Sequence, residues 1–180
     1  MTERSVQRGA EGLYDPAFER DSCGFGLIAN LDDLPSHFVV ETAIAALARL
    51  THRGAVAPDG KTGDGCGLLI KFPFRFLREV GEELGFELSE RFAAGTVFLS
   101  HDKAVAATAR ATIETAVREA GLEVAGWREV PTDPSACGEV ALKTLPRIEQ
   151  VFVNAGEGMQ RGRFNRRLFL ARRRAENRLD

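Results

Sequence analysis

Residues 21–30 read Asp21-Ser22-Cys23-Gly24-Phe25-Gly26-Leu27-Ile28-Ala29-Asn30, so a single cysteine stands between a charged leader and a short apolar run. The apolar run predicts a strand over residues 25–31 that begins almost at the sulfur atom. Gly24 and Gly26 lack side chains, which leaves the backbone near the thiol open to close approach by another molecule. The sequence therefore places the Cys23 thiol at the mouth of a strand.

This position of Cys23 suits an N-terminal nucleophile. If the chain is cut between Ser22 and Cys23, the sulfur shares its residue with a free α-amine, whose ordinary pKa of about 7.7–8.0 suits a general base at neutral pH. In the intact chain Cys23 has only an amide nitrogen, which is not a base, so the intact chain is expected to be an inactive precursor. The local pattern by itself favours the alternative, a buried structural cysteine, because free cysteine is among the most buried residue types.

Motifs along the rest of the chain decide between these two interpretations. They are Gly12-Leu13-Tyr14-Asp15-Pro16, Glu19-Arg20-Asp21-Ser22-Cys23-Gly24, Thr51-His52-Arg53-Gly54-Ala55, Thr62-Gly63-Asp64-Gly65-Cys66-Gly67, Gly126-Trp127-Arg128-Glu129-Val130-Pro131 and Ile148-Glu149-Gln150-Val151-Phe152. In this order they closely resemble the start of the glutamate synthase large subunit, and the resemblance spans nearly the whole chain. It implies a class II glutamine amidotransferase domain with the N-terminal-nucleophile hydrolase fold, in which a short leader is removed to expose the cysteine.

The resemblance implies the fold and its boundaries. The expected fold class is α/β (α+β), a layered αββα sandwich that is incomplete at its C-terminus. Residues 1–22 become a leader or propeptide, although segments of such composition are more commonly flexible tails. Residues 23–180 become the N-terminal part of a type 2 glutamine amidotransferase domain.

The resemblance also implies the site residues. Cys23 is the catalytic residue, and Gly24, Arg53, Asp64 and Gly65 are structural residues of the active site. From its sequence context alone, Arg53 is expected to be a solvated loop arginine. A guanidinium fixed beside the nucleophile would instead orient a carboxylate, because it stays charged and offers several donors in one plane.

A glycine-rich stretch over residues 57–65 leads into a predicted strand over residues 67–72. Phosphate-binding loops follow a strand and open a helix, so this stretch does not fit one. It is interpreted as a glycine-lined wall near the active cysteine. Members of the resembling family usually have alanine at the position of Cys66, so this chain places a second thiol near the site.

Composition is that of an ordinary soluble domain of 180 residues, with 44% hydrophobic residues, 28% charged residues and a formal net charge of −2. The three cysteines suggest neither a disulfide framework nor a metal site, and a reducing cytoplasm is the natural setting. No apolar run reaches the roughly 20 residues of a membrane helix, so no membrane partner is expected.

Strands and helices are expected to alternate without an internal repeat. Helices are predicted over residues 36–50, 73–85, 102–121 and 137–144, and Asp102 is expected to cap the third. The residues expected to point inward are Val40, Ala43, Ile44 and Leu47 in the first helix. In the second helix they are Phe76, Leu77, Val80 and Leu84. Further strands are predicted over 95–100, 124–130 and 148–153. Residues 161–180 hold eight arginines against two acids, but apolar residues at helical spacing favour a surface helix over a nucleic-acid arm.

The implied function is that of the glutaminase part of glutamate synthase, which hydrolyses L-glutamine to glutamate and ammonia. In the family the glutamine carboxylate clamp and the oxyanion hole come later than the matched stretch, so the chain is expected to be an N-terminal part. No cofactor is expected in this chain, because FMN and an iron–sulfur cluster belong to the synthase part. The expected partners are the remainder of the large subunit and a small subunit. The alternatives are a catalytically incomplete folding or assembly module, and another N-terminal-nucleophile amide hydrolase.

Overall fold

The computed structural model describes residues 24–50, 54–63 and 65–179. By its internal contacts the chain divides into two units. The first comprises residues 1–55 and 63–68, and the second comprises residues 56–62 and 69–180. Each unit is taken by itself below.

The first unit contains one helix, α1 (His37–Ala48), among its described residues. Ser36 precedes it as predicted, but the Ser36 side chain makes no capping hydrogen bond. The predicted buried face is wrong, because α1 has no buried residue and Ile44 is 54% exposed. The strand predicted over residues 25–31 is also wrong, since residues 24–30 pair with no strand.

The second unit is built on an antiparallel sheet of three strands, β1 (Phe92–Leu99), β2 (Glu123–Glu129) and β3 (Arg147–Asn154). The strand order is β1-β3-β2, so β3 lies in the centre. Pairing between β1 and β3 is regular along the whole strand, whereas the pairing of β2 with β3 is interrupted by an irregularity between Val124 and Gly126. These strands confirm the three predicted in this part of the chain, with slightly different ends.

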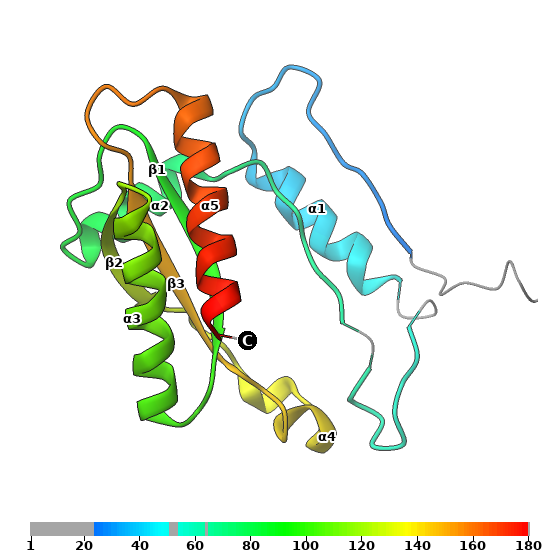
Figure 1. Cartoon of the computed structure of the whole chain (residues 1–180). Coiled ribbons are helices and arrows are strands. Elements are labelled where there is room, and N and C mark those ends of the chain that lie inside the picture. The colour runs from blue at the N-terminus through cyan, green and yellow to red at the C-terminus, as the bar shows by residue number, and fades with distance from the viewer. Residues whose placement is uncertain (1–23, 51–53, 64, 180) are drawn as a thin grey trace, which may run out of the picture. The chain divides into compact units, whose positions relative to one another are not determined.

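Two long helices, α3 (Lys103–Glu119) and α5 (Arg161–Leu179), cover one face of this sheet and lie side by side, as Figure 1 shows. Asp102 caps α3 as predicted, because its carboxylate accepts hydrogen bonds from the backbone of Ala104 at 2.8 Å and Val105 at 3.1 Å. The core between the helices and the sheet contains Val117, Leu122, Val151, Val153, Ala155, Phe164 and Ala171. The arginine-rich segment is thus a helix with its apolar side against the sheet.

The opposite face of the sheet is partly covered by α2 (Phe74–Glu83). Its Leu77 and Val80 pack with Phe92 of β1 and Phe152 of β3 in a second core. The other two residues predicted to point inward are exposed, Phe76 by 53% and Leu84 by 47%. No strand forms over residues 67–72, so that prediction is wrong as well.

Short elements connect β2 to β3. A 3-10 turn, η3 (Pro134–Ala136), is followed by the one-turn helix α4 (Glu139–Leu142), close to the short helix predicted there. Among the described residues, no helix is both long enough and apolar enough to span a lipid bilayer.

Candidate active site

Three of the five predicted site residues, Cys23, Arg53 and Asp64, lie outside the described residues. Gly24 and Gly65 are described, and both are exposed and belong to no helix or strand. A Cβ atom added at Gly65 would meet no heavy atom within 4 Å, so the described surroundings do not themselves require glycine there. The roles assigned to these five residues therefore stay predictions.

The segment that follows Cys23 ends in a tight turn organised by Asn30. The Asn30 side chain accepts a hydrogen bond from the backbone of Asp32 at 3.2 Å and donates one to the Leu34 carbonyl at 3.1 Å. Asp33 adopts the left-handed conformation with φ 53°, which short polar residues tolerate better than others. This turn precedes α1.

The glycine-rich loop is organised by Asp59. The Asp59 carboxylate accepts hydrogen bonds from the backbone of Lys61 at 3.0 Å and of Thr62 at 2.8 Å, and from the Thr62 hydroxyl at 2.5 Å. The backbone of Ala57 also donates to the Thr62 carbonyl at 2.7 Å, which closes the loop. Gly60 at its tip has φ +70°, a conformation that L side chains rarely adopt.

These donors stabilise the ionised form of Asp59. The hydrogen bonds from the Thr62 hydroxyl and from the Thr62 and Lys61 backbone hold the pKa of Asp59 far below its ordinary value. The carboxylate is therefore ionised at neutral pH. Its role is to order the loop, and it is a poor candidate for a general acid or base.

The same loop contacts the N-terminus of α4. A Cβ atom at Gly138 would collide with the side chains of Asp59 and Thr62, so the absence of a side chain at Gly138 allows the close approach. The Asp59 carboxylate lies 3.5 Å from the backbone nitrogen of Val140, and the Thr62 hydroxyl lies 3.4 Å from that of Ala141. Sequence analysis missed this contact. The Asp59-Gly60 pair signals a turn, but nothing local links it to Gly138.

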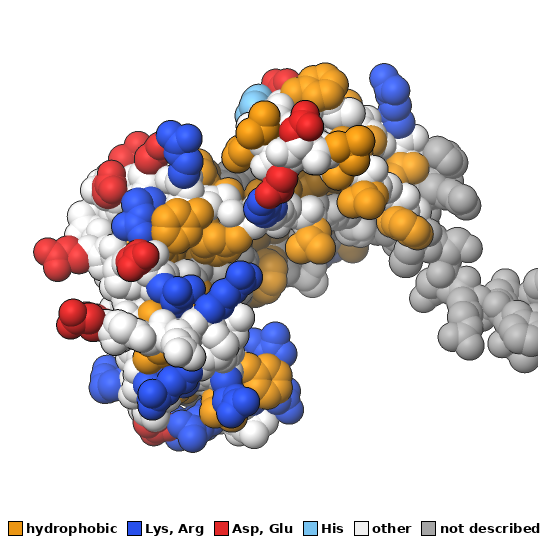
Figure 2. Space-filling model, turned by 90° about the horizontal axis from the view of Figure 1, so that it is seen from above, with side chains coloured by type: hydrophobic (Ala, Val, Ile, Leu, Met, Phe, Trp, Pro, Cys, Tyr) orange, Lys and Arg blue, Asp and Glu red, His pale blue; other side chains and the backbone are white. Residues whose placement is uncertain are grey.

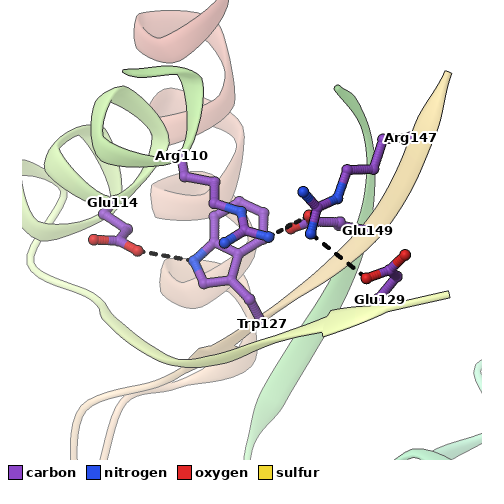
Figure 3. A network of polar contacts seen from close by, with 6 residues as sticks. All are labelled: Arg110, Glu114, Trp127, Glu129, Arg147 and Glu149. Atoms are coloured by element: carbon purple, nitrogen blue, oxygen red, sulfur yellow. Dashed lines mark hydrogen bonds and ion pairs between the residues drawn. The ribbon is translucent and has the colours of Figure 1, made fainter. Parts of the chain in front are cut away.

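A buried polar network lies between α3 and the sheet, and it too was not predicted (Figure 3). Glu149 of β3 has no exposed surface, and its carboxylate pairs with Arg110 of α3. Arg147, two residues before it on β3, places its Nε atom 2.8 Å from the same carboxylate oxygen and contacts Glu129 of β2 at 3.5 Å. The second carboxylate oxygen, Oε2, has no hydrogen-bond partner among the described residues.

Trp127 of β2 extends this network. Its ring nitrogen donates to Glu114 of α3 at 2.9 Å, and the guanidinium of Arg110 lies 5.5 Å from the ring centroid, within reach of a cation–π interaction. Arg110 thus contacts both the Trp127 ring and the Glu149 carboxylate, as Figure 3 shows. The network therefore ties α3 to β2 and β3.

The two described cysteines are both free, and they differ in accessibility. Cys66 is exposed, whereas Cys137 is partly buried. In the part of the chain that the structure describes, no group of three or more histidine, cysteine, aspartate or glutamate side chains could hold a metal ion. Cys66 is therefore the described thiol that reagents in solution can reach most easily.

Comparison with known proteins defines the class of this chain. The model of the family described as "Glutamine amidotransferases class-II" matches residues 23–180. The chain belongs to this family of enzymes.

Similar proteins narrow the assignment to the glutamate synthases. The chain is 37% identical to the "Glutamate synthase [NADPH] large chain" of Bacillus subtilis over 169 residues, which are 93% of this chain and 11% of that protein. It is 39% identical over 165 residues to the protein of the same name from Azospirillum brasilense, covering 91% of this chain and 11% of the relative. It is 37% identical over 163 residues to "Ferredoxin-dependent glutamate synthase 1, chloroplastic/mitochondrial" of Arabidopsis thaliana, covering 89% and 10%. The chain therefore spans about a tenth of the length of these relatives.

Proposed function

We propose that this chain is the beginning of the glutamine-hydrolysing part of a glutamate synthase large chain, with Cys23 as the nucleophile. The observation that carries the proposal is the position of the family match, which begins at Cys23 and runs to residue 180. The three relatives named above are glutamate synthases and match about 90% of this chain, which supports glutamine as the substrate. Gly24, Arg53, Asp64 and Gly65 shape the pocket around the thiol in this proposal.

The proposed reaction begins when residues 1–22 are removed as a propeptide. The freed α-amine of Cys23 accepts the thiol proton, and the thiolate attacks the carbonyl carbon of the glutamine side-chain amide. The C–N bond breaks, and the protonated α-amine returns a proton to the leaving ammonia. Water then hydrolyses the γ-glutamyl thioester, which releases glutamate and restores the thiol.

The proposal leaves the second half of glutamate synthesis to polypeptide beyond this chain. Ammonia passes to 2-oxoglutarate in a synthase part, which also holds the FMN and the iron–sulfur cluster and binds a small subunit. No cofactor and no nucleic acid are assigned to this chain, and its setting is the cytoplasm. The oxyanion donors come from the same further polypeptide; the loss of one such donor typically lowers the rate by about 10²–10³.

The test combines three measurements on the purified chain. Intact mass shows whether the chain begins at Cys23, a glutaminase assay measures ammonia release, and a glutamine-like electrophile labels the active thiol. We expect Cys23→Ala and Cys23→Ser to lose both hydrolysis and labelling. Cys66→Ala is the matched control for hydrolysis, which it should leave unchanged because the resembling family usually has alanine at this position. Any labelling that it removes is that of an exposed thiol other than the nucleophile. Hydrolysis that persists in Cys23→Ala would refute the proposed nucleophile.

A second candidate function, assembly without turnover, is favoured by exposed apolar side chains. Among the described residues Leu69 is 99% exposed, Leu31 98% and Phe25 93%. Figure 2 shows hydrophobic side chains at many places on one face of the molecule. Apolar surface of this extent is typical of a protein that packs against further polypeptide. An intact mass that corresponds to a chain starting at Met1 or Thr2, together with no release of ammonia, would favour this candidate.

A third alternative is another amide hydrolase with an N-terminal nucleophile. Faster hydrolysis of an amide other than glutamine would favour it.

A further inference from the structure

The Asp59 loop (residues 56–62) interrupts the part of the chain that carries the proposed active site. The loop belongs to the second unit, whereas residues 1–55 before it and residues 63–68 after it belong to the first. All the residues proposed for the site fall in those two segments: Cys23, Gly24, Arg53, Asp64 and Gly65. In the sequence the loop therefore stands between Arg53 and Asp64, so a contact that holds the loop acts close to both.

The loop is closed at its base. The backbone of Ala57 donates to the Thr62 carbonyl at 2.7 Å, and the backbone of Gly60 donates to the Ala57 carbonyl at 2.9 Å. A Cβ atom at Gly63 would lie only 2.9 Å from the Ala55 carbonyl oxygen, so the two ends of the loop are too close for a side chain there. Because these contacts constrain the backbone up to Gly63, a shift of Thr62 also displaces the residue that follows Gly63.

The loop supplies the hydrogen-bond acceptors at the start of α4. The first amides of a helix have no partner within the helix and need an acceptor from outside it. Gly138 precedes α4 and has no side chain that could serve. The Val140 amide instead donates to the Asp59 carboxylate, and the Ala141 amide donates to the Thr62 hydroxyl. The two acceptors lie 81 and 79 residues away in the sequence, so the cap of α4 is a tertiary contact.

Gly138 allows the loop and α4 to meet. A Cβ atom at this position would lie 2.6 Å from the Thr62 backbone nitrogen, and it would also collide with the Thr62 hydroxyl and the Asp59 carboxylate. Rotation of a side chain cannot relieve the collision, because one of the contacts is with the backbone. A side chain at Gly138 therefore displaces the loop from α4.

We propose that Gly138 is a positioning residue for the proposed glutamine site, because it lets α4 hold the Asp59 loop and thereby fixes the segment that carries Asp64 and Gly65. This inference rests on the proposed function. Thr62 is a second positioning residue, since its hydroxyl contacts both the Asp59 carboxylate and α4. Placement matters because a displacement of about 1 Å can lower the rate of an enzyme about 10²-fold.

The test compares two reagents that alkylate Cys23 in the purified full chain. One is a diazoketone analogue of glutamine, and the other is iodoacetamide, which has no glutamine part to be recognised. Mass spectrometry of peptides separates Cys23 from the other two cysteines. We expect Gly138→Ala and Thr62→Val to slow labelling of Cys23 by the glutamine analogue about tenfold or more, and to leave labelling by iodoacetamide nearly unchanged. Thr62→Ser keeps the hydroxyl and should be labelled at the wild-type rate.

Two controls separate lost positioning from lost stability. Gly162→Ala is the same substitution at a position of α5 where a Cβ atom meets nothing within 4 Å, and it should be labelled like the wild type. Asp102→Ala removes the cap of α3, which destabilises the second unit at an element other than α4, and it should also be labelled like the wild type. Equal slowing in Asp102→Ala and Gly138→Ala would mean that stability alone controls labelling, which would overturn the proposal.

Hydrogen exchange tests the contact between the loop and α4 without any chemistry at Cys23. The amides of Val140 and Ala141 should exchange faster in Gly138→Ala than in the wild type, because their acceptors are displaced. Unchanged exchange, or faster exchange with unchanged labelling by the glutamine analogue, would overturn the positioning role and leave the proposed function intact. If the analogue does not label Cys23 of the wild type, the proposed function itself fails, and the positioning role fails with it.

Discussion

Glu149 on β3 is ion-paired with Arg110 on α3, 39 residues away in the sequence, and the Glu149 side chain has no contact with solvent. The pair joins a helix to the central strand, and Arg147 supports it from the same strand. Removing one partner of a buried pair is costly because the remaining charge loses its counterion. The contribution of this network to the free energy of unfolding can therefore be measured by removing one of its charges.

Glu149→Gln should destabilise the chain. Arg110 and Arg147 are 35% and 32% exposed, so water will partly compensate them, and we expect a loss of about 2 kcal/mol in the free energy of unfolding. Denaturant unfolding followed by the fluorescence of Trp127, the single tryptophan, measures it. Arg173→Ala removes an exposed pair with Glu176 and should cost less than about 0.5 kcal/mol. Equal costs for the two variants would contradict a structural role for Glu149.

The pKa of Asp59 should depend chiefly on Thr62. Removing the hydroxyl in Thr62→Val should raise the pKa of Asp59 toward its ordinary value of 3.8, because the largest stabilising hydrogen bond is lost. Lys61→Ala is the control, since Lys61 donates only through its backbone. Titration of the carboxyl carbon by NMR distinguishes the two. The same midpoint in both variants would show that the hydroxyl is not the main cause.

The same low pKa predicts how stability responds to acid. A carboxylate whose pKa is lower in the folded state stabilises the fold above the unfolded-state pKa, and this contribution is lost as the pH falls through the folded-state pKa. Asp59→Asn should therefore be less stable than the wild type at neutral pH. The difference between the two should shrink progressively below about pH 3.8. Unfolding curves at a series of pH values measure it, and a difference that grows with acidity would contradict the assignment.

Two glycine-to-alanine substitutions should change the free energy of unfolding in opposite directions. Gly138→Ala should destabilise by about 1–3 kcal/mol, because its Cβ would collide with Asp59 and Thr62. Gly162→Ala lies in α5, where a Cβ meets nothing within 4 Å, and should stabilise by up to about 0.5 kcal/mol through the helix preference of alanine. Thermal unfolding compares the two. If Gly138→Ala left the thermal stability unchanged, Asp59 and Thr62 would not be packed closely against the N-terminus of α4.

Substitutions at the residues that precede α3 and α1 should differ in their effect on stability. Asp102→Ala should cost about 1 kcal/mol, because it removes the acceptor for two backbone donors of α3. Ser36→Ala should have little effect, since Ser36 makes no capping hydrogen bond to α1. Thermal unfolding measures the first change, and the helical circular dichroism signal measures the second. A larger effect for Ser36→Ala would mean that its hydroxyl does cap the helix in solution.

Elements that depend on local chemistry could be predicted from the sequence. Asp102 marks the start of α3 because a capping carboxylate needs only the next few backbone amides. The apolar stripe of α5 marks its buried side, with Phe164, Ala171 and Ala175 all buried. The motifs spread along the chain from residue 12 to residue 152 also sufficed to identify the family. The site residues Cys23, Arg53 and Asp64 stay predictions.

What depends on distant partners could not be predicted. Residues 25–31 and 67–72 have the apolar pattern of strands but form none, because a strand needs a neighbour for its backbone hydrogen bonds and the pattern specifies only a preference. Glu149 shares a face of β3 with buried Val151, and nothing in Ile148-Glu149-Gln150 shows that Arg110 will compensate its charge. The sequence around Gly138 does not distinguish it from other loop glycines, because its need for a missing side chain comes from contact with Asp59 and Thr62. The sequence by itself determined the family, from motifs along the whole chain, and also the Asp102 cap and the buried side of α5, which are set by residues a few positions apart. Only the tertiary structure decided which strands found partners and which buried charges were paired, because those energies arise between segments that meet on folding.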